Sequence, residues 1–218
     1  VMTAKGFSAP DAEAAFSRGR ALCEQVGESP YQFPIMVGLF YYHAFCAEWT
    51  LTEHPGEQVL ALARKDNNDG GQMLGLWILS TTALFRGRFE QGLSQAKSAA
   101  LLYDPDKHRD LARDYGVHPA PSAMDWEAWG HWLTGYPEAY RRKDQDALAL
   151  TREINHPLTS AMVIVHSALW HSMRDDAAHA LTHAQETIAL CQEAGIPLRR
   201  IEGEIIEGWA LAEQGEIE

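Results

Sequence analysis

Two histidines with the spacing of metal ligands lie in a stretch that the sequence predicts to be helical. His179 and His183 are four residues apart, and residues at that distance lie on one face of an α-helix. Two imidazoles placed in this way could bind a transition metal ion such as Zn²⁺. Ala180 and Ala184 lie beside them at the positions that a helix–helix contact would use. We therefore expect both histidines at the edge of that contact, and we predict no metal site.

The signatures of common catalytic sites are missing from the sequence. His166 and His171 are five residues apart and do not share a helix face. A Ser–His–Asp triad could be drawn among the 10 histidines, but no Gly-x-Ser-x-Gly turn supports one. There is no Gly-rich loop followed by Lys and Ser or Thr, which a P-loop nucleotide site needs, and no carboxylate pair at cyclase-like spacing. The sequence thus predicts neither catalytic residues nor a cofactor, and a metal-binding or hydrolytic helical enzyme that uses the histidines stays as an alternative.

A polar and aromatic segment at about residues 103–120 is a second candidate for binding chemistry. Its members combine hydroxyl, carboxylate, imidazole and guanidinium groups: Tyr103, Asp104, His108, Arg109 and Tyr115. Loops on a rigid scaffold often carry binding residues. The alternative is a brace between structural units, in which Asp104 caps a short helix that contains His108 and Arg109. We expect Arg109 to pair with a nearby carboxylate, such as Asp104 or Asp106, rather than with a ligand.

Helices must position these candidates. The sequence predicts a unit of two helices joined by a turn, and this unit recurs along the chain. From Leu76 to Pro105, apolar and small residues recur at helical spacing on either side of Gly87, which predicts two helices joined by a turn. Similar turns recur at a constant interval that only the 103–120 insert lengthens. The turn markers are Ala47, Gly87, Gly135, Asp175 and Gly215. We predict an all-α protein, a right-handed superhelix of tetratricopeptide-like helix pairs with about 40 residues per repeat and roughly ten helices.

Large aromatic residues recur at one position of these helices. Six residues before the turn markers the sequence holds Tyr41, Thr81, Trp129, Leu169 and Trp209. In stacked helix pairs this position tends to face the concave side, so we predict a groove that binds a protein or peptide segment. The alternative is that the rings only fill space between unequal helices. Because the insert interrupts the regular groove, we expect recognition to centre on Trp77, Trp129 and Trp132 beside it.

Charge and composition exclude some classes of partner. The 218 residues include 30 acidic residues against 18 Lys plus Arg, for a net charge of −12. This charge repels phosphate backbones, so we predict no nucleic acid partner. The sequence has neither an apolar run long enough to span a membrane nor a signal peptide, so we expect a soluble, cytoplasmic protein without a membrane partner. Cys23, Cys46 and Cys191 are far apart, and we interpret them as reduced packing residues.

Short motifs spread over nearly the whole chain carry a resemblance to a known family. They are Gly38-Leu39-Phe40, Leu102-Tyr103-Asp104-Pro105 with His108 and Arg109, Tyr115-Gly116, Trp132-Leu133 with Gly135-Tyr136-Pro137, His156-Pro157, and Gly208-Trp209-Ala210-Leu211-Ala212-Glu213-Gln214-Gly215. With these motifs the chain resembles the C-terminal tetratricopeptide-like region of bacterial signalling proteins that join an adenylate/guanylate cyclase or regulatory domain to a STAND-type ATPase. It departs from them at Tyr140, where the packing pattern uses alanine, and at His118, where that family usually has an acid.

The resemblance implies a non-catalytic sensing and scaffolding region. We expect residues 1–218 to form a single helical repeat domain, excised from a longer chain that carries the ATPase or nucleotide cyclase activity. Its partners would be a protein or peptide segment, including the attached ATPase or cyclase domains. A passive structural spacer is a further alternative, and it would bind no ligand and tolerate changes in the groove.

Overall fold

The protein is all-helical, as predicted. The computed structural model describes residues 8–27, 29 and 31–215, so the outermost residues of the predicted 1–218 domain lie outside the described part. The described residues form twelve helices and no strand. Ten of these are long, and the other two are the short helices α7 and α8 of the insert. In chain order they are α2 (Pro10–Val26), α3 (Gln32–Phe45), α4 (Glu53–Lys65), α5 (Asp69–Phe85), α6 (Phe89–Ala100), α7 (Pro105–His108), α8 (Leu111–Tyr115), α9 (Pro119–Leu133), α10 (Pro137–Ile154), α11 (Pro157–Ser172), α12 (Ala177–Ala194) and α13 (Pro197–Glu213).

Residues in the left-handed backbone region end most of the long helices, and they recur at a regular interval. The five turn markers all have a positive φ: Ala47, Gly87, Gly135, Asp175 and Gly215. A second series alternates with the first and is also evenly spaced except across the insert: Gly27, Asn67, Gly116, Asn155 and Gly195. A left-handed residue after a helix reverses the chain and satisfies the last carbonyl groups. Most consecutive long helices are therefore joined by short reversals of the chain, whereas the insert with α7 and α8 separates α6 from α9.

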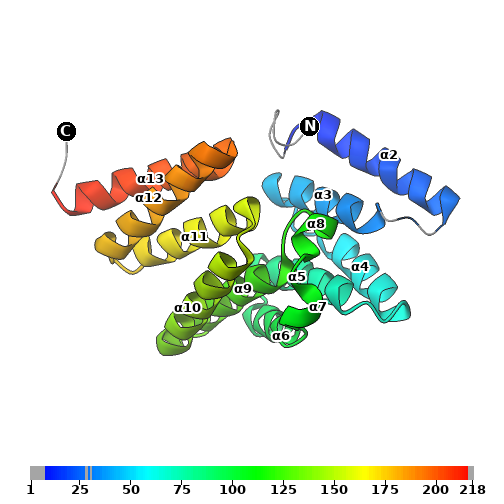
Figure 1. Ribbon diagram of the computed structural model, residues 1–218, viewed down its shortest axis with the longest axis horizontal. Helices are drawn as coiled ribbons and strands as arrows, with labels where there is room; N and C mark the ends of the chain where they lie inside the picture. Colours follow the sequence, from blue (N-terminus) through cyan, green and yellow to red (C-terminus); the bar gives the residue numbers. More distant parts are fainter. Residues whose placement is uncertain (1–7, 28, 30, 216–218) are drawn as a thin grey trace.

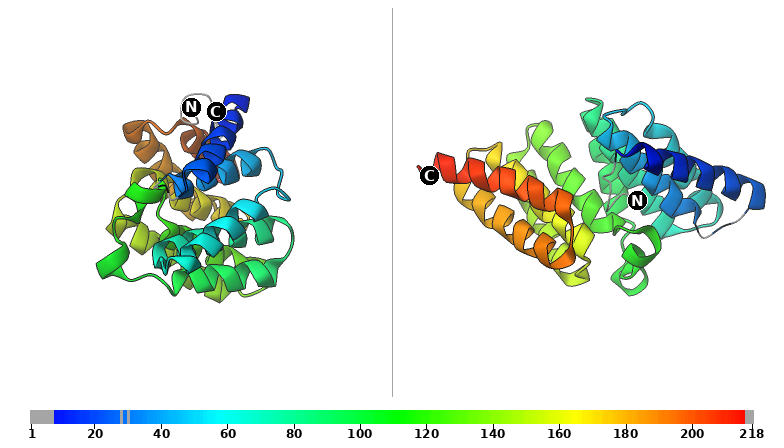
Figure 2. Two further views of the ribbon diagram at one scale, coloured as in Figure 1. Left: turned by 90° about the vertical axis from the view of Figure 1, so that its right-hand side faces the viewer. Right: turned by 90° about the horizontal axis from the view of Figure 1, so that it is seen from above.

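The helices are packed in an arrangement that brings distant parts of the chain together. Each long helix packs against the next, and α5, α9, α11 and α13 also pack against one another in turn. The row of helices is curved, so that α3 and the start of α13 face each other (Figure 1). From above, α12 and α13 lie side by side at the end of the molecule away from α2 (Figure 2). The curve is bridged by Arg199, whose guanidinium carbon lies 5.9 Å from the centre of the Phe45 ring.

Gly75 marks a place where two helices approach so closely that no side chain fits. A Cβ atom at this position of α5 would lie 2.8 Å from the backbone nitrogen of Leu60 in α4. Because backbone cannot move aside as a side chain can, we expect Gly75→Ala to lower the free energy of unfolding by about 1–3 kcal/mol. Chemical denaturation measures this change.

The matched control is Gly208→Ala in α13, where an added Cβ would meet no atom within 4 Å. Alanine restricts the unfolded chain more than glycine does, and at this open helical position it meets no other atom. The free energy of unfolding of this variant should therefore rise by about 0.5–1 kcal/mol. Equal effects of the two substitutions would contradict the close approach of α4 and α5.

Candidate functional site

A cavity of about 270 Å³ lies where alternate helices converge on the inner side of the curve. Its walls come from α3, α5, α9, α11 and the start of α13, together with the loop after α3. These segments lie far apart in the sequence and are brought together only by the curve of the array. The lining residues are Phe40, Tyr41, Ala44, Phe45, Trp49, Trp77, Thr81, Phe85, Trp126, Met162, His166, Arg199 and Glu202.

Aromatic rings that pack on one another form most of the cavity wall. The Trp77 ring makes edge contacts with Phe40 and Tyr41, at centroid distances of 5.3 and 6.0 Å. On the other side, Trp49 stacks on Phe85 with centroids 4.0 Å apart and an interplanar angle of 4°. Phe85 and Trp49 are only partly covered, whereas Trp77 is 1% exposed. Rings fixed by such contacts lose little conformational entropy when they bind an apolar group.

Charged and polar groups stand at a few defined points of this apolar wall. His166 on α11 shares a hydrogen bond with the buried Asp125, with 2.6 Å between Nδ1 and Oδ2. Arg199 on α13 donates to Glu202 at 2.7 Å, and its guanidinium lies over Phe45. A few polar groups on an otherwise apolar wall are typical of ligand sites, where they orient the bound molecule.

Tyr41 and two tryptophans supply further donors at the cavity. Burial raises the pKa of Tyr41 to about 12 against a smaller opposing effect of Arg199, so the phenol stays protonated and donates to Met162 Sδ at 3.7 Å. The indole N–H groups of Trp77 and Trp126 are buried and have no acceptor within the described part of the chain. An unpaired buried donor costs free energy.

The structure separates the aromatic residues that the sequence predicts for the groove. Tyr41 and Trp77 line the cavity. Trp129 is not among the lining residues. Its ring lies tilted at 35° to that of Trp170, with centroids 4.0 Å apart, and makes an edge contact with the lining residue Phe85 at 5.2 Å. Trp132 contacts Tyr140 between α9 and α10, 6.0 Å between centroids.

Trp209 lies elsewhere again, against the core between α11, α12 and α13. Of the three residues around which recognition was expected to centre, Trp77, Trp129 and Trp132, only Trp77 lines the cavity. Trp126 is 5% exposed, belongs to the main core cluster and also lines the cavity.

The insert packs against α3 and α5 and does not reach the cavity. Asp104 caps α7 by accepting a hydrogen bond from the Asp106 backbone N–H at 3.0 Å. Tyr115 is buried against Phe33, with a centroid distance of 5.5 Å, and His108 is 7% exposed. These contacts have the form of the brace between structural units.

The remaining insert residues fit the same description. Tyr103 packs edge-on against the His118 ring at 5.7 Å. Asp104 forms its ion pair with Lys107 at 2.9 Å, instead of with the expected Arg109, which is exposed. None of the five predicted insert residues is among the described residues that line the cavity.

The sequence-based prediction missed the residues that complete the cavity from other helices. Phe85, His166 and Arg199 belong to three different helices, and no local pattern relates them. One signal was present: Phe85 directly precedes the turn at Gly87 as Phe45 precedes that at Ala47, two residues before each marker. A second aromatic column at that position would have pointed to the mouth of the cavity.

Comparison with models of known protein families and with curated proteins gave no match to this chain. No helix in the described part of the chain has both the length and the apolar composition that crossing a membrane requires. The function is therefore argued from the cavity and the helical arrangement.

Proposed function

We propose that this chain is a non-catalytic binding module, a right-handed superhelix of tetratricopeptide-like helix pairs that takes up a protein or peptide segment at the aromatic cavity. The observation that carries the proposal is the cavity itself, because rings from alternate helices converge there on a space of about 270 Å³. A space of this size fits one large apolar side chain rather than a whole drug-sized molecule. The two alternating series of left-handed turns support the repeat architecture.

The chemistry of the wall favours a segment that inserts an apolar anchor and brings its own acceptor. Aromatic residues dominate the energetics of such pockets. Arg199 lines the cavity, and its guanidinium has N–H donors besides the one bound to Glu202 that a carbonyl or carboxylate of the segment could accept from. Hydrolysis is less well supported, because the lining holds no serine or cysteine within the described residues and the Thr81 hydroxyl already donates to the Trp77 carbonyl at 3.0 Å.

The wider setting follows from the resemblance stated for the sequence. We propose that the module is part of a cytoplasmic bacterial signalling protein in which an attached ATPase or cyclase domain responds to occupancy of the cavity. The net charge of −12 disfavours nucleic acid as the occupant. A passive spacer remains the alternative, and it differs by having no saturable ligand.

Filling the cavity tests the proposal. Ala44 lines the cavity, so Ala44→Phe should occupy the space where the anchor inserts. Peptides that bind the unaltered protein are first selected from a random displayed library and then synthesised. Their affinity for Ala44→Phe should be at least tenfold lower, a difference of about 1.4 kcal/mol in binding free energy. Fluorescence anisotropy of labelled peptides measures the affinity.

The control is Ala149→Phe, the same enlargement at an exposed position of α10. It should leave both peptide affinity and melting temperature unchanged. Peptides that bind Ala44→Phe as tightly as the unaltered protein would place recognition elsewhere, and failure to select any saturable peptide would favour the spacer.

A further inference from the structure

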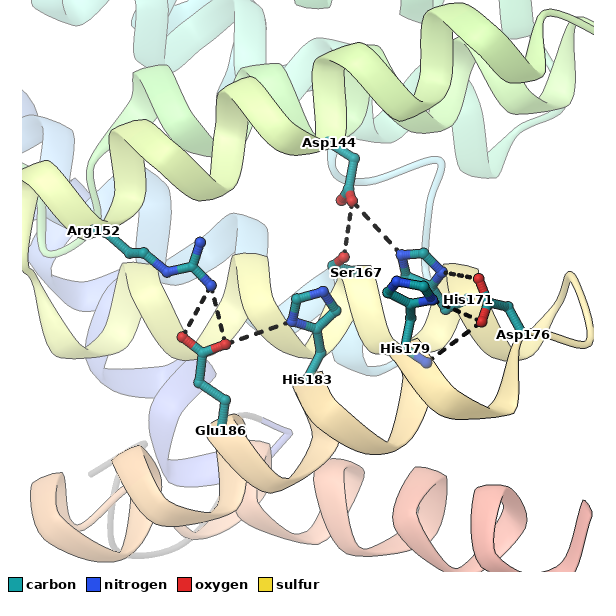
Figure 3. A network of polar contacts seen from close by, with 8 residues as sticks. All are labelled: Asp144, Arg152, Ser167, His171, Asp176, His179, His183 and Glu186. Atoms are coloured by element: carbon teal, nitrogen blue, oxygen red, sulfur yellow. Dashed lines mark hydrogen bonds and ion pairs between the residues drawn. The ribbon is translucent and has the colours of Figure 1, made fainter. Parts of the chain in front are cut away.

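A cluster of histidine and aspartate side chains lies at the turn between α11 and α12 (Figure 3), and none of its residues lines the aromatic cavity. His171 is in the last turn of α11, Asp176 is the N-cap of α12, and His179 follows in the first turn. The Nδ1 atom of His171 lies 3.1 Å from Asp176 Oδ2, and that of His179 lies 2.9 Å from Oδ1. One ligand atom from each residue lies within 4.8 Å of the other two.

We propose that His171, Asp176 and His179 form a binding site for one divalent transition-metal ion, with Zn²⁺ as the best fit. Two imidazoles and a carboxylate make a ligand set that suits Zn²⁺, Co²⁺ or Ni²⁺ and does not suit Mg²⁺, which prefers oxygen ligands. This site is independent of the aromatic cavity and of the function proposed for it.

The three side chains need only a small adjustment to coordinate an ion. Ligand atoms about 2.0–2.1 Å from a tetrahedral metal are about 3.3 Å apart, close to the two separations to Asp176 of 3.1 and 2.9 Å. The rings of His171 and His179 are already nearly parallel, 5.1 Å apart with an interplanar angle of 21°. The His179 side chain is 66% exposed, so an ion can enter from solvent and the fourth position stays open to water.

Asp144 on α10 places a carboxylate on the far side of the His171 ring, just beyond hydrogen-bond distance. Its Oδ2 atom lies 3.9 Å from Nε2 of His171, the ring nitrogen that faces away from Asp176. Metal-binding histidines usually direct their other ring nitrogen to a carboxylate, which fixes the ring and strengthens the ligand. Ser167 holds this carboxylate in place by donating to Oδ2 at 3.0 Å.

The pair of histidines that has the metal spacing in the sequence does not form the site. His183 lies beside His171, with ring centroids 5.7 Å apart, but its Nδ1 faces Glu186 at 3.5 Å. Glu186 is itself bound by Arg152 at 3.1 Å. The partner of His179 is therefore His171 from the preceding helix, across a turn that sequence spacing does not reveal.

Calorimetric titration of the untagged protein with ZnCl₂ tests the proposal. The expected result is saturable binding of one ion per chain, with no binding of MgCl₂ under the same conditions. Asp176→Asn keeps a good N-cap residue but removes the charge, and His179→Ala removes an exposed ligand, so both should abolish or strongly weaken the binding. Asp144→Asn should weaken it by about 10–100-fold, as for other partners of metal-bound histidines.

The exposed His54 on α4 supplies the matched control, because His54→Ala removes an imidazole outside the cluster and should leave the affinity unchanged. Circular dichroism verifies that each variant is folded, and the absorption spectrum of bound Co²⁺ reports its coordination. Absence of one-to-one binding, or equal affinity of Asp176→Asn, His179→Ala and the unaltered protein, would overturn the proposal. In that case the cluster serves only to cap α12.

Discussion

Trp77→Ala is expected to lower the free energy of unfolding by about 3–5 kcal/mol, the usual cost of removing a buried aromatic side chain. Trp77 is 1% exposed and lies in the main core cluster, with ring contacts to Phe40 and Tyr41. Its loss would open a void where α3 and α5 meet the cavity. Equilibrium unfolding in denaturant, followed by circular dichroism, measures the change.

Trp77→Phe separates packing from the effect of the indole N–H. The phenyl ring keeps part of the packed volume and removes a buried donor that has no acceptor within the described part of the chain. Trp77→Phe should therefore lower the free energy of unfolding clearly less than Trp77→Ala does. If alanine is tolerated as well as phenylalanine, Trp77 is not part of the core.

Acidification should destabilise the protein through His118, by up to roughly 3 kcal/mol between about pH 7 and about pH 4. His118 is fully buried, and burial lowers its pKa to about 4, with a hydrogen bond to the His108 carbonyl acting in the opposite direction. As pH falls, the unfolded chain takes up a proton near the usual value of 6.5, whereas the folded protein does so only near 4. Stability contributed by the neutral ring is therefore present above pH 6.5 and lost progressively down to about 4.

Burial keeps the His118 ring neutral, and one of its two hydrogen bonds also needs the neutral ring. Nε2 lies 2.8 Å from the His108 carbonyl and must carry the proton, while Nδ1 accepts from the Ala120 N–H at 3.3 Å. A second proton on Nδ1 would remove the acceptor that caps α9.

Two variants test the role of the ring. His118→Asn retains a capping residue without the titratable group, so its stability should vary less between the two pH values, although it is lower at neutral pH. In Thr159→Val the His118 ring remains. The acceptor of the His118 backbone N–H, 2.9 Å away, is lost, together with the hydroxyl that shares a hydrogen bond with His156 Nδ1 at 2.9 Å. The loss of stability between the two pH values that His118 causes should therefore persist in this variant. The same acid sensitivity in His118→Asn would assign it to other groups.

The helices were predictable because local chemistry determines where they end. The constant interval between turn markers predicts turns at Ala47 and Asp175 although neither is glycine, and both adopt a positive φ. The two helices beyond the expected ten arise from the insert, where Asp104 caps α7. Helix capping depends on neighbours in the chain, so it can be recognised from sequence.

The cavity and the histidine cluster were not predictable in the same way. The approach of Arg199 to Phe45 depends on the sum of the angles between successive helices, which no single segment determines. The pairing of His171 with Asp176 and His179 similarly depends on the geometry of one turn. Sequence spacing groups His179 with His183, whereas in the structure His179 Nδ1 contacts Asp176 and its ring stacks on that of His171.

Contacts between helices that are distant in the sequence also affect how the chain folds. Arrays in which each unit contacts only its neighbours can unfold in parts, starting from their ends. Here Tyr41 of α3 donates to Met162 of α11, 121 residues away in the chain, so helices that are distant in sequence are thermodynamically coupled. Such contacts raise the contact order and slow the search for the native state, and the curved array is expected to unfold as one cooperative unit.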